Sequence, residues 1–208
     1  EIAMSDWSSD VCSSDLKIYP IGIQNFEKIR NEGYYYVDKT ALIYRLVKTG
    51  SYYFLSRPRR FGKSLLISTL EAYFLGKKEL FEGLAMAQLE KNWIRRPVLH
   101  LDLNIGKYDA PDSLDKILEE ALSKWEITYG TGVGETTLAL RFKGIVERAS
   151  QQSGQRVAIL VDEYDKPLLQ AIGNKELQSA YRNTLKPFYG VLKTMDGYIQ
   201  FAMLTGVT

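Results

Sequence analysis

The stretch from Tyr52 to Leu66 constrains the fold more than any other part of the chain. It begins with an apolar run, continues through the basic loop SRPRRFG, and enters a helical pattern at Lys63 and Ser64. The unsatisfied amides of a helix's first turn favour an anion, and a glycine before them lets the backbone approach a phosphate closely. The stretch therefore predicts a strand–loop–helix unit that binds phosphate, known as a P-loop or Walker A motif.

Each part of this loop has a place in that prediction. Lys63 can reach the β- and γ-phosphates of a nucleotide, and the Ser64 hydroxyl can coordinate Mg²⁺. We expect the nucleotide to contact Arg59, Arg60, Phe61, Gly62, Lys63, Ser64 and Leu65. Arg57 stands where the pattern G-x-x-x-x-G-K-[ST] has its first glycine, so the loop must leave the strand differently from the usual one. The alternative is a basic surface turn between a strand and a helix.

A second motif follows later in the chain, where an apolar run from Val157 to Val161 ends in Asp162 and Glu163. Such a run is typical of a strand buried on both faces of a parallel sheet, and ligands bind at the C-terminal edge of such sheets. At this position, called Walker B, Asp162 would hold Mg²⁺ opposite Ser64, and Glu163 would polarise the attacking water. A solvated strand-end turn is the alternative, but the two motifs together favour a nucleotide site.

Several phrases of the sequence resemble one bacterial family. They are FLSRPRRFGKSL at 54–65, YYVDKT at 35–40, LFEGL at 80–84, VDEYDKP at 161–167 and LTGVT at 204–208. These phrases are similar to those of the bacterial AAA-ATPase-like proteins, which are P-loop ATPases usually followed by a PD-(D/E)XK nuclease-like domain. The resemblance implies ATP and Mg²⁺ as ligands and makes arginine the usual residue at position 57. It also suggests that residues 18–22 line an adenine pocket, although a plain edge contact explains them equally well.

Strands and helices alternate along the chain, which indicates a parallel sheet covered on both sides. We expect strands at 52–55, 98–103, 157–161 and 198–204. Apolar residues at helical spacing predict helices over 66–74, 114–125, 138–149 and 177–185, the last disturbed at Pro187. Gly130 to Gly134 is interpreted as a linker. With the resemblance, the predicted fold class is α/β: a P-loop NTPase three-layer sandwich with a mainly parallel sheet, truncated at its C-terminus.

Individual polar residues allow more local predictions. Thr205 ends the last strand, where a γ-phosphate sensor would lie, although an ordinary strand-end hydrogen bond explains a hydroxyl there equally well. We interpret Asp165 as a helix cap rather than a site residue, and Asp38 as the N-cap of a helix that ends at Gly50. Because His100 has no Cys or His partner, we expect a polar group in or beside the sheet rather than a metal ligand.

Composition sets limits on the class of protein. The chain has 208 residues, 45% of them hydrophobic, which can form one substantial core, and no apolar window is long enough to span a membrane. A net charge of +2 gives no whole-protein attraction to nucleic acid or membranes. We expect residues 1–16 to be a non-native or disordered leader and 17–208 to be one P-loop domain, itself a fragment. The one cysteine, Cys12, falls in that leader, which fits a cytoplasmic protein.

Three functions follow from these observations. The first is Mg²⁺-dependent ATP hydrolysis, with Lys63, Glu163 and Thr205 as catalytic residues and with Ser64 and Asp162 holding the metal. The second is a nucleotide-gated switch, in which ATP stabilises a conformation for a partner and turnover is incidental. The third is binding of nucleic acid, either through the arginines at 57, 59 and 60 or through a C-terminal nuclease-like domain beyond this chain.

Overall fold

The structure is a computed structural model that describes residues 18–207. The prediction of a leader over 1–16, including Cys12, lies outside the described residues. Within residues 18–207 no helix combines the length and the apolar character needed to cross a bilayer.

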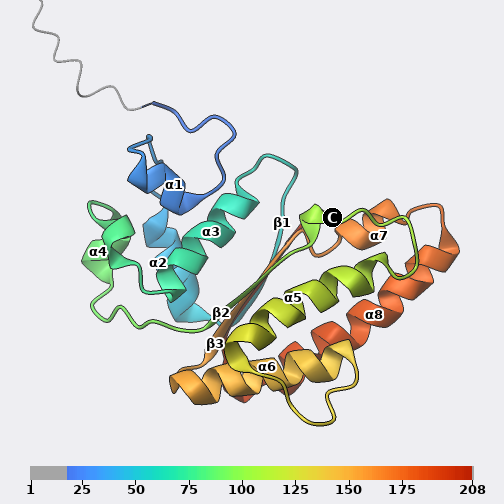
Figure 1. Ribbon diagram of the computed structural model, residues 1–208. Helices are drawn as coiled ribbons and strands as arrows, with labels where there is room; N and C mark the ends of the chain where they lie inside the picture. The colour runs from blue at the N-terminus through green and yellow to red at the C-terminus, as the bar shows by residue number, and fades with distance from the viewer. Residues whose placement is uncertain (1–17, 208) are drawn as a thin grey trace, which may run out of the picture.

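A four-stranded sheet in the order β1-β4-β3-β2 forms the centre of the molecule, and every neighbouring pair of its strands is parallel (Figure 1). The strands are β1 (Tyr52–Ser56), β2 (Val98–Asp102), β3 (Val157–Asp162) and β4 (Ile199–Gly206). The apolar runs seen in the sequence fall on these four strands, and β3 is buried along its whole length. An α/β fold with a parallel sheet is therefore confirmed.

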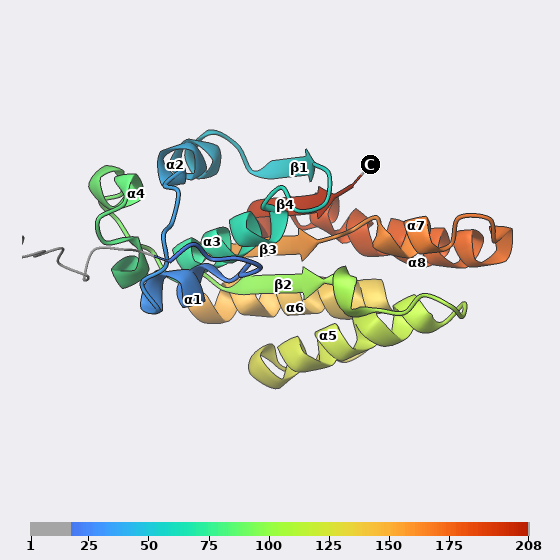
Figure 2. The same cartoon turned by 90° about the horizontal axis from the view of Figure 1, so that it is seen from above.

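Helices cover both faces of the sheet. They are α1 (Phe26–Asn31), α2 (Thr40–Thr49), α3 (Lys63–Phe74), α4 (Ala85–Leu89), α5 (Ser113–Tyr129), α6 (Leu138–Ser153), α7 (Lys166–Gln170) and α8 (Lys175–Thr194). Figures 1 and 2 show α1 to α4 gathered around one side and edge of the sheet and α5, α6 and α8 on the other. The predicted helices after the P-loop and over 114–125, 138–149 and 177–185 all lie within helices of the structure.

Strand alternation divides the core into two clusters, because successive side chains point to opposite faces of the sheet. Leu160 faces α3 and packs with Ile67 and Leu70. The residues before and after Leu160 in β3 face α5, α6 and α8 instead. On that side the Phe142 and Phe188 rings stack with their centroids 4.4 Å apart. The sheet is thus held rigidly between two apolar layers, which fixes the ends of its strands.

Two details of the helices differ from the predictions. The helix predicted to be disturbed at Pro187 continues to Thr194, because Pro187 lies on the exposed side of a strongly amphipathic helix whose other side is buried. The N-cap of α2 is Lys39 rather than Asp38. The Asp38 carboxylate nevertheless accepts the Thr40 N–H at 2.8 Å and reaches α4, where it accepts the Ala85 N–H at 2.7 Å.

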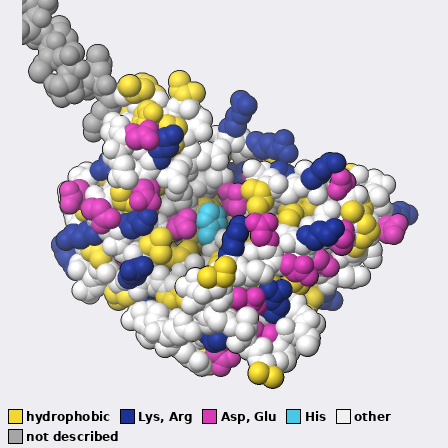
Figure 3. Space-filling view, viewed as in Figure 1, with side chains coloured by type: hydrophobic (Ala, Val, Ile, Leu, Met, Phe, Trp, Pro, Cys, Tyr) yellow, Lys and Arg dark blue, Asp and Glu magenta, His cyan; other side chains and the backbone are white. Residues whose placement is uncertain are grey.

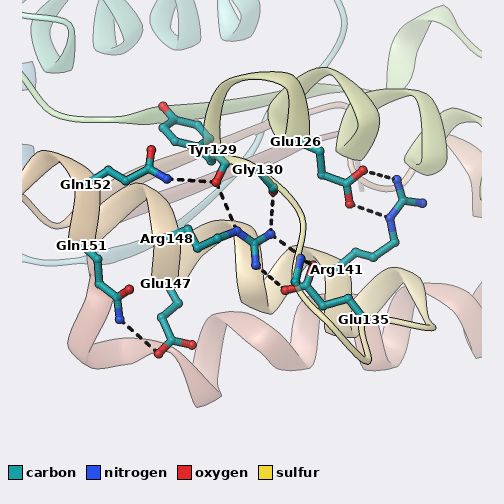
Figure 4. A network of polar contacts seen from close by, with 10 residues as sticks. Glu126, Tyr129, Gly130, Glu135, Arg141, Glu147, Arg148, Gln151 and Gln152 are labelled. Carbon is teal, nitrogen blue, oxygen red and sulfur yellow. Dashed lines mark hydrogen bonds and ion pairs between the residues drawn. The ribbon is translucent and has the colours of Figure 1, made fainter.

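Two arginines of α6 hold the loop between α5 and α6 in place (Figure 4). Arg141 donates two hydrogen bonds to the Glu126 carboxylate, at 2.8 and 2.7 Å. Arg148 forms an ion pair with Glu135 and donates to the carbonyl oxygen of Gly130 at 2.8 Å. The Arg148 contacts hold both ends of the glycine-rich segment against α6. The segment connects α5 and α6, as predicted for a linker.

Candidate functional site

Three neighbouring strands bring the two sequence motifs together at the C-terminal edge of the sheet. β1 leads into the P-loop and α3, β3 ends at Asp162, and β4 lies between these two strands. Leu55 of β1 pairs with Thr205 of β4, and Val161 of β3 pairs with Leu204. The strand order therefore places Thr205 between the P-loop and the acidic pair, on the face of the sheet that α3 covers.

The loop between β1 and α3 explains how the chain tolerates arginine in place of the first glycine. The Arg57 N–H donates to the carbonyl oxygen of Gly206 at 3.2 Å, so this residue continues the ladder between β1 and β4. The positive φ angles occur later, at Arg60 (+66°) and at Gly62 (+77°), which is the N-cap of α3. A Cβ on Gly62 would meet nothing within 4 Å, so glycine is favoured there by its backbone conformation rather than by lack of space.

The predicted nucleotide-contacting residues differ in exposure. Arg59, Arg60 and Phe61 are exposed, whereas Ser64 and Leu65, in the first turn of α3, are half-buried. Figure 3 shows basic side chains along the upper rim of the molecule, above the end of β1.

Lys63 is buried, with 5% of its surface exposed, and its ammonium group has three acceptors. Its Nζ lies 3.1 Å from the carbonyl oxygen of Arg57, 3.3 Å from that of Pro58 and 3.2 Å from Oε1 of Glu163. The ammonium thus donates two hydrogen bonds to its own loop and forms an ion pair with Glu163. The predicted P-loop lysine and the predicted Walker B glutamate are therefore in direct contact.

Thr205 connects the two acids of the second motif. It is fully buried, and its hydroxyl donates to the carboxylate of Asp162, which is itself 5% exposed. The same hydroxyl accepts the Glu163 N–H at 3.3 Å. Glu163 has a φ of +53°, a left-handed conformation that directs the chain away from β3. Thr205 thus makes the strand-end hydrogen bonds considered above, and a role as γ-phosphate sensor stays a prediction.

Asp165 lies at the N-cap of α7, as predicted, but its side chain does not make the capping hydrogen bond. Instead Oδ2 of its buried carboxylate accepts the N–H of Val207 at 2.8 Å. Because Val207 lies just beyond β4, its amide leaves the ladder there, and Asp165 provides a partner for it.

The sequence reasoning missed Asp102. This residue ends β2, pairs in register with Asp162 and lies on the same face of the sheet. One of its oxygens accepts the N–H of Asn104 at 2.8 Å, so it also caps the turn that follows. The available signal was an acid at the end of an apolar run, the pattern that identified Asp162.

His100 lies beside these acids on the edge strand (Figure 3). Its Nδ1 is 3.1 Å from a carboxylate oxygen of Glu71 on α3, whereas its buried Nε2 has no hydrogen-bond partner within residues 18–207. Burial lowers the pKa of His100, but the carboxylates of Glu71, Asp102 and Asp162 outweigh that effect and raise it above its usual value. The histidine is a polar group beside the sheet, as expected, and its environment is acidic.

A cavity of about 690 Å³ adjoins the P-loop on the side of α2. Tyr19, Pro20 and Tyr35 lie on one wall, and Gly62 and Leu65 lie on another. The rings of Tyr19 and Tyr35 meet edge to face with their centroids 5.5 Å apart. Tyr19 and Pro20 of the segment 18–22 thus line a mostly apolar cavity next to the predicted phosphate site, and an adenine pocket there stays a prediction.

The family model described as "Predicted AAA-ATPase" matches residues 20–208, so the chain belongs to this AAA-ATPase-like family. It is also 41% identical over 194 residues to a protein of Azotobacter chroococcum mcd 1 described as "Uncharacterized protein in vnfD 5'region". That match covers 92% of this chain but 37% of the relative, so the chain spans little more than a third of the relative's length. No solved structure gives a significant match.

Proposed function

We propose that this member of the predicted AAA-ATPase family binds ATP with Mg²⁺ at the loop between β1 and α3 and hydrolyses it. One observation carries the proposal. The ammonium of Lys63 lies 3.2 Å from the carboxylate of Glu163, although 100 positions (163 − 63) of sequence separate these two residues. A P-loop lysine and a Walker B glutamate that meet at one sheet edge are the arrangement needed to act on one phosphate group.

The chain supplies positive charge and amide donors for the phosphates. Gly62 and the first turn of α3 present N–H groups that have no partner within the helix. Lys63 adds a buried cation, and Arg59 and Arg60 add exposed cations on the same loop. Together these groups fit a polyphosphate better than a single carboxylate, because they extend along the loop.

The residues present also fit Mg²⁺. The side chains assigned to it are the half-buried Ser64 hydroxyl and the Asp162 carboxylate, which Thr205 holds in place. Within residues 18–207 no group of three or more His, Cys, Asp or Glu side chains is arranged to hold a metal ion. Two protein oxygens suit Mg²⁺, which keeps several waters and takes further oxygens from phosphates. When bound, the ion would neutralise charge on the phosphates.

Glu163 and Thr205 are assigned to the hydrolytic step. Once it leaves Lys63, the Glu163 carboxylate can accept a proton from the attacking water and orient it for in-line attack. Thr205 connects Asp162 with the backbone of Glu163, so its hydroxyl is suited to couple these two residues to the state of the γ-phosphate.

The cavity beside the P-loop suits the nucleotide base. Its volume of about 690 Å³ is in the range of small-molecule sites, and it opens next to Gly62 and Leu65. Tyr19 and Tyr35 give it an aromatic wall against which a purine ring can pack. The choice of adenine rather than guanine rests on the family.

The variant Glu163→Gln separates hydrolysis from a nucleotide-gated switch. If the protein is an ATPase, this variant should still bind nucleotide but release phosphate at least about a hundredfold more slowly, because general base catalysis contributes that much or more. Unchanged phosphate release would refute the catalytic assignment. Wild-type protein that binds ATP without measurable turnover would instead favour the nucleotide-gated switch. The Lys63–Glu163 contact is compatible with that function too. A nuclease-like domain, a nucleic-acid partner and a cytoplasmic location stay predictions.

A further inference from the structure

We propose that the Lys63–Glu163 ion pair competes with nucleotide phosphate, so that phosphate binding itself releases the Glu163 carboxylate for hydrolysis. This inference rests on the function proposed above and adds the regulation of the same site. It would make the catalytic carboxylate available only when a nucleotide is present.

Three oxygens already surround the ammonium group of Lys63. This ammonium is buried and is bound by two main-chain carbonyl oxygens of its own loop and by Glu163. Because three oxygens already surround this buried ammonium, a phosphate oxygen that approaches it competes with them for the same space and charge. Glu163 is the acceptor on a movable side chain, whereas the other two belong to the backbone of residues 57 and 58.

The electrostatics of the site favour the same competition. The Glu163 side chain is only 16% exposed and the Lys63 side chain 4% exposed, so solvent screens this pair weakly. A phosphate bound to Lys63 would bring a second anion against the Glu163 carboxylate in the same poorly screened space. The two anions repel each other there, so binding of one favours departure of the other.

Backbone strain supports the same proposal. Within residues 18–207, Arg60 and Glu163 are the only non-glycine residues with positive φ, at +66° and +53°. One lies in the P-loop and the other at the end of β3, so the two strained positions belong to the two loops that the ion pair joins. Left-handed backbone at bulky residues persists where surrounding contacts impose it and is frequent in switch regions.

The main chain at Glu163 is held in place, whereas its side chain is free to rotate. Its N–H donates to the Thr205 hydroxyl at 3.3 Å, and the following N–H, of Tyr164, donates to the carbonyl oxygen of Thr205 at 2.8 Å. These bonds hold the main chain next to Asp162 whether or not the carboxylate touches Lys63. The side chain can therefore exchange one position for another by rotation alone.

The test measures ADP affinity by calorimetry without Mg²⁺, which excludes turnover. Glu163→Gln keeps the shape of the side chain and removes its charge, and Glu163→Asp keeps the charge but is too short to retain the contact. We expect both variants to bind ADP more tightly than wild type, the Gln variant by about tenfold, the equivalent of one charged hydrogen bond. The matched control is Glu27→Gln, which breaks the Lys77–Glu27 ion pair (2.6 Å) away from the site and should leave ADP affinity unchanged.

The outcomes separate the two proposals. Equal or weaker ADP binding by both Glu163 variants, with wild-type binding intact, overturns the competition and leaves the nucleotide site standing. Tighter binding by Glu163→Gln but not by Glu163→Asp also overturns it, because general repulsion of phosphate would then suffice. Absence of ADP binding in wild type and in every variant overturns the proposed function, and the competition with it.

Discussion

Replacing Thr205 by valine tests whether this hydroxyl organises the site. Thr205 is fully buried, and valine has nearly the same shape, so the change removes the hydroxyl and little else. The 5% exposed Asp162 carboxylate then loses its hydrogen bond from the hydroxyl, and the Glu163 N–H loses its acceptor. Leaving a buried acceptor unsatisfied costs about 1–3 kcal/mol, and the half-buried N–H can regain part of its loss from water. We expect valine to lower the free energy of unfolding by about 2 kcal/mol.

Urea denaturation of wild type, Thr205→Val and Thr205→Ser measures this effect. Serine keeps the hydroxyl and loses one buried methyl group, which should cost about 1 kcal/mol. The account therefore predicts the order wild type, serine, valine, with unchanged dependence of the free energy on urea. A valine variant as stable as the serine variant, or more stable, would refute the reasoning about Asp162.

Two further predictions concern the surroundings of the site, and a third concerns the loop between α5 and α6. His100 is the single histidine, so its NMR titration is unambiguous: its pKa should lie above the usual value and fall in Glu71→Gln. Because the pKa of His100 is raised in the folded state, the Glu71–His100 contact should stabilise the protein at pH values below the unfolded-state pKa. This stabilisation should disappear as the pH rises through the folded-state pKa. Thermal unfolding should therefore depend on pH in wild type and depend on it less in Glu71→Gln. Asp102→Asn should keep the turn cap, and so the melting temperature, because an amide oxygen can also accept the Asn104 N–H, whereas Asp102→Ala should lower the melting temperature. Arg148→Met should lower the free energy of unfolding by about 1–3 kcal/mol, because it leaves Glu135 and the carbonyl of residue 130 without their partner, and wild-type stability would contradict the role given to this network.

The sequence allowed accurate prediction where the signal is local. The run from Val157 to Val161 is buried on both faces, as an uninterrupted apolar run indicates, and the basic loop lies between a strand and a helix that begins at Lys63. These features depend on neighbouring residues alone. The expectation that two motifs distant in sequence share one sheet edge also proved correct, because parallel strands all end on the same side.

The remaining features depend on contacts between distant residues. Nothing local indicates that β4 lies between β1 and β3, and this order is what brings Thr205 to Asp162. The Asp165 carboxylate accepts from Val207 rather than from its own helix, because tertiary packing brings the end of β4 next to it. Pro187 was misjudged for a related reason: burial of one side of α8 outweighs the lost hydrogen bond on the exposed side.

Equilibrium binding of ATP to wild type and to Lys63→Ala, with and without Mg²⁺, tests the central claim most directly. The account predicts binding to wild type that Mg²⁺ strengthens. It predicts a loss of at least about tenfold in affinity for the alanine variant, because a buried cation that contacts phosphate contributes at least one charged hydrogen bond. Equal affinities of the two proteins, or binding that does not respond to Mg²⁺, would contradict the assignment of a nucleotide site to this edge of the sheet.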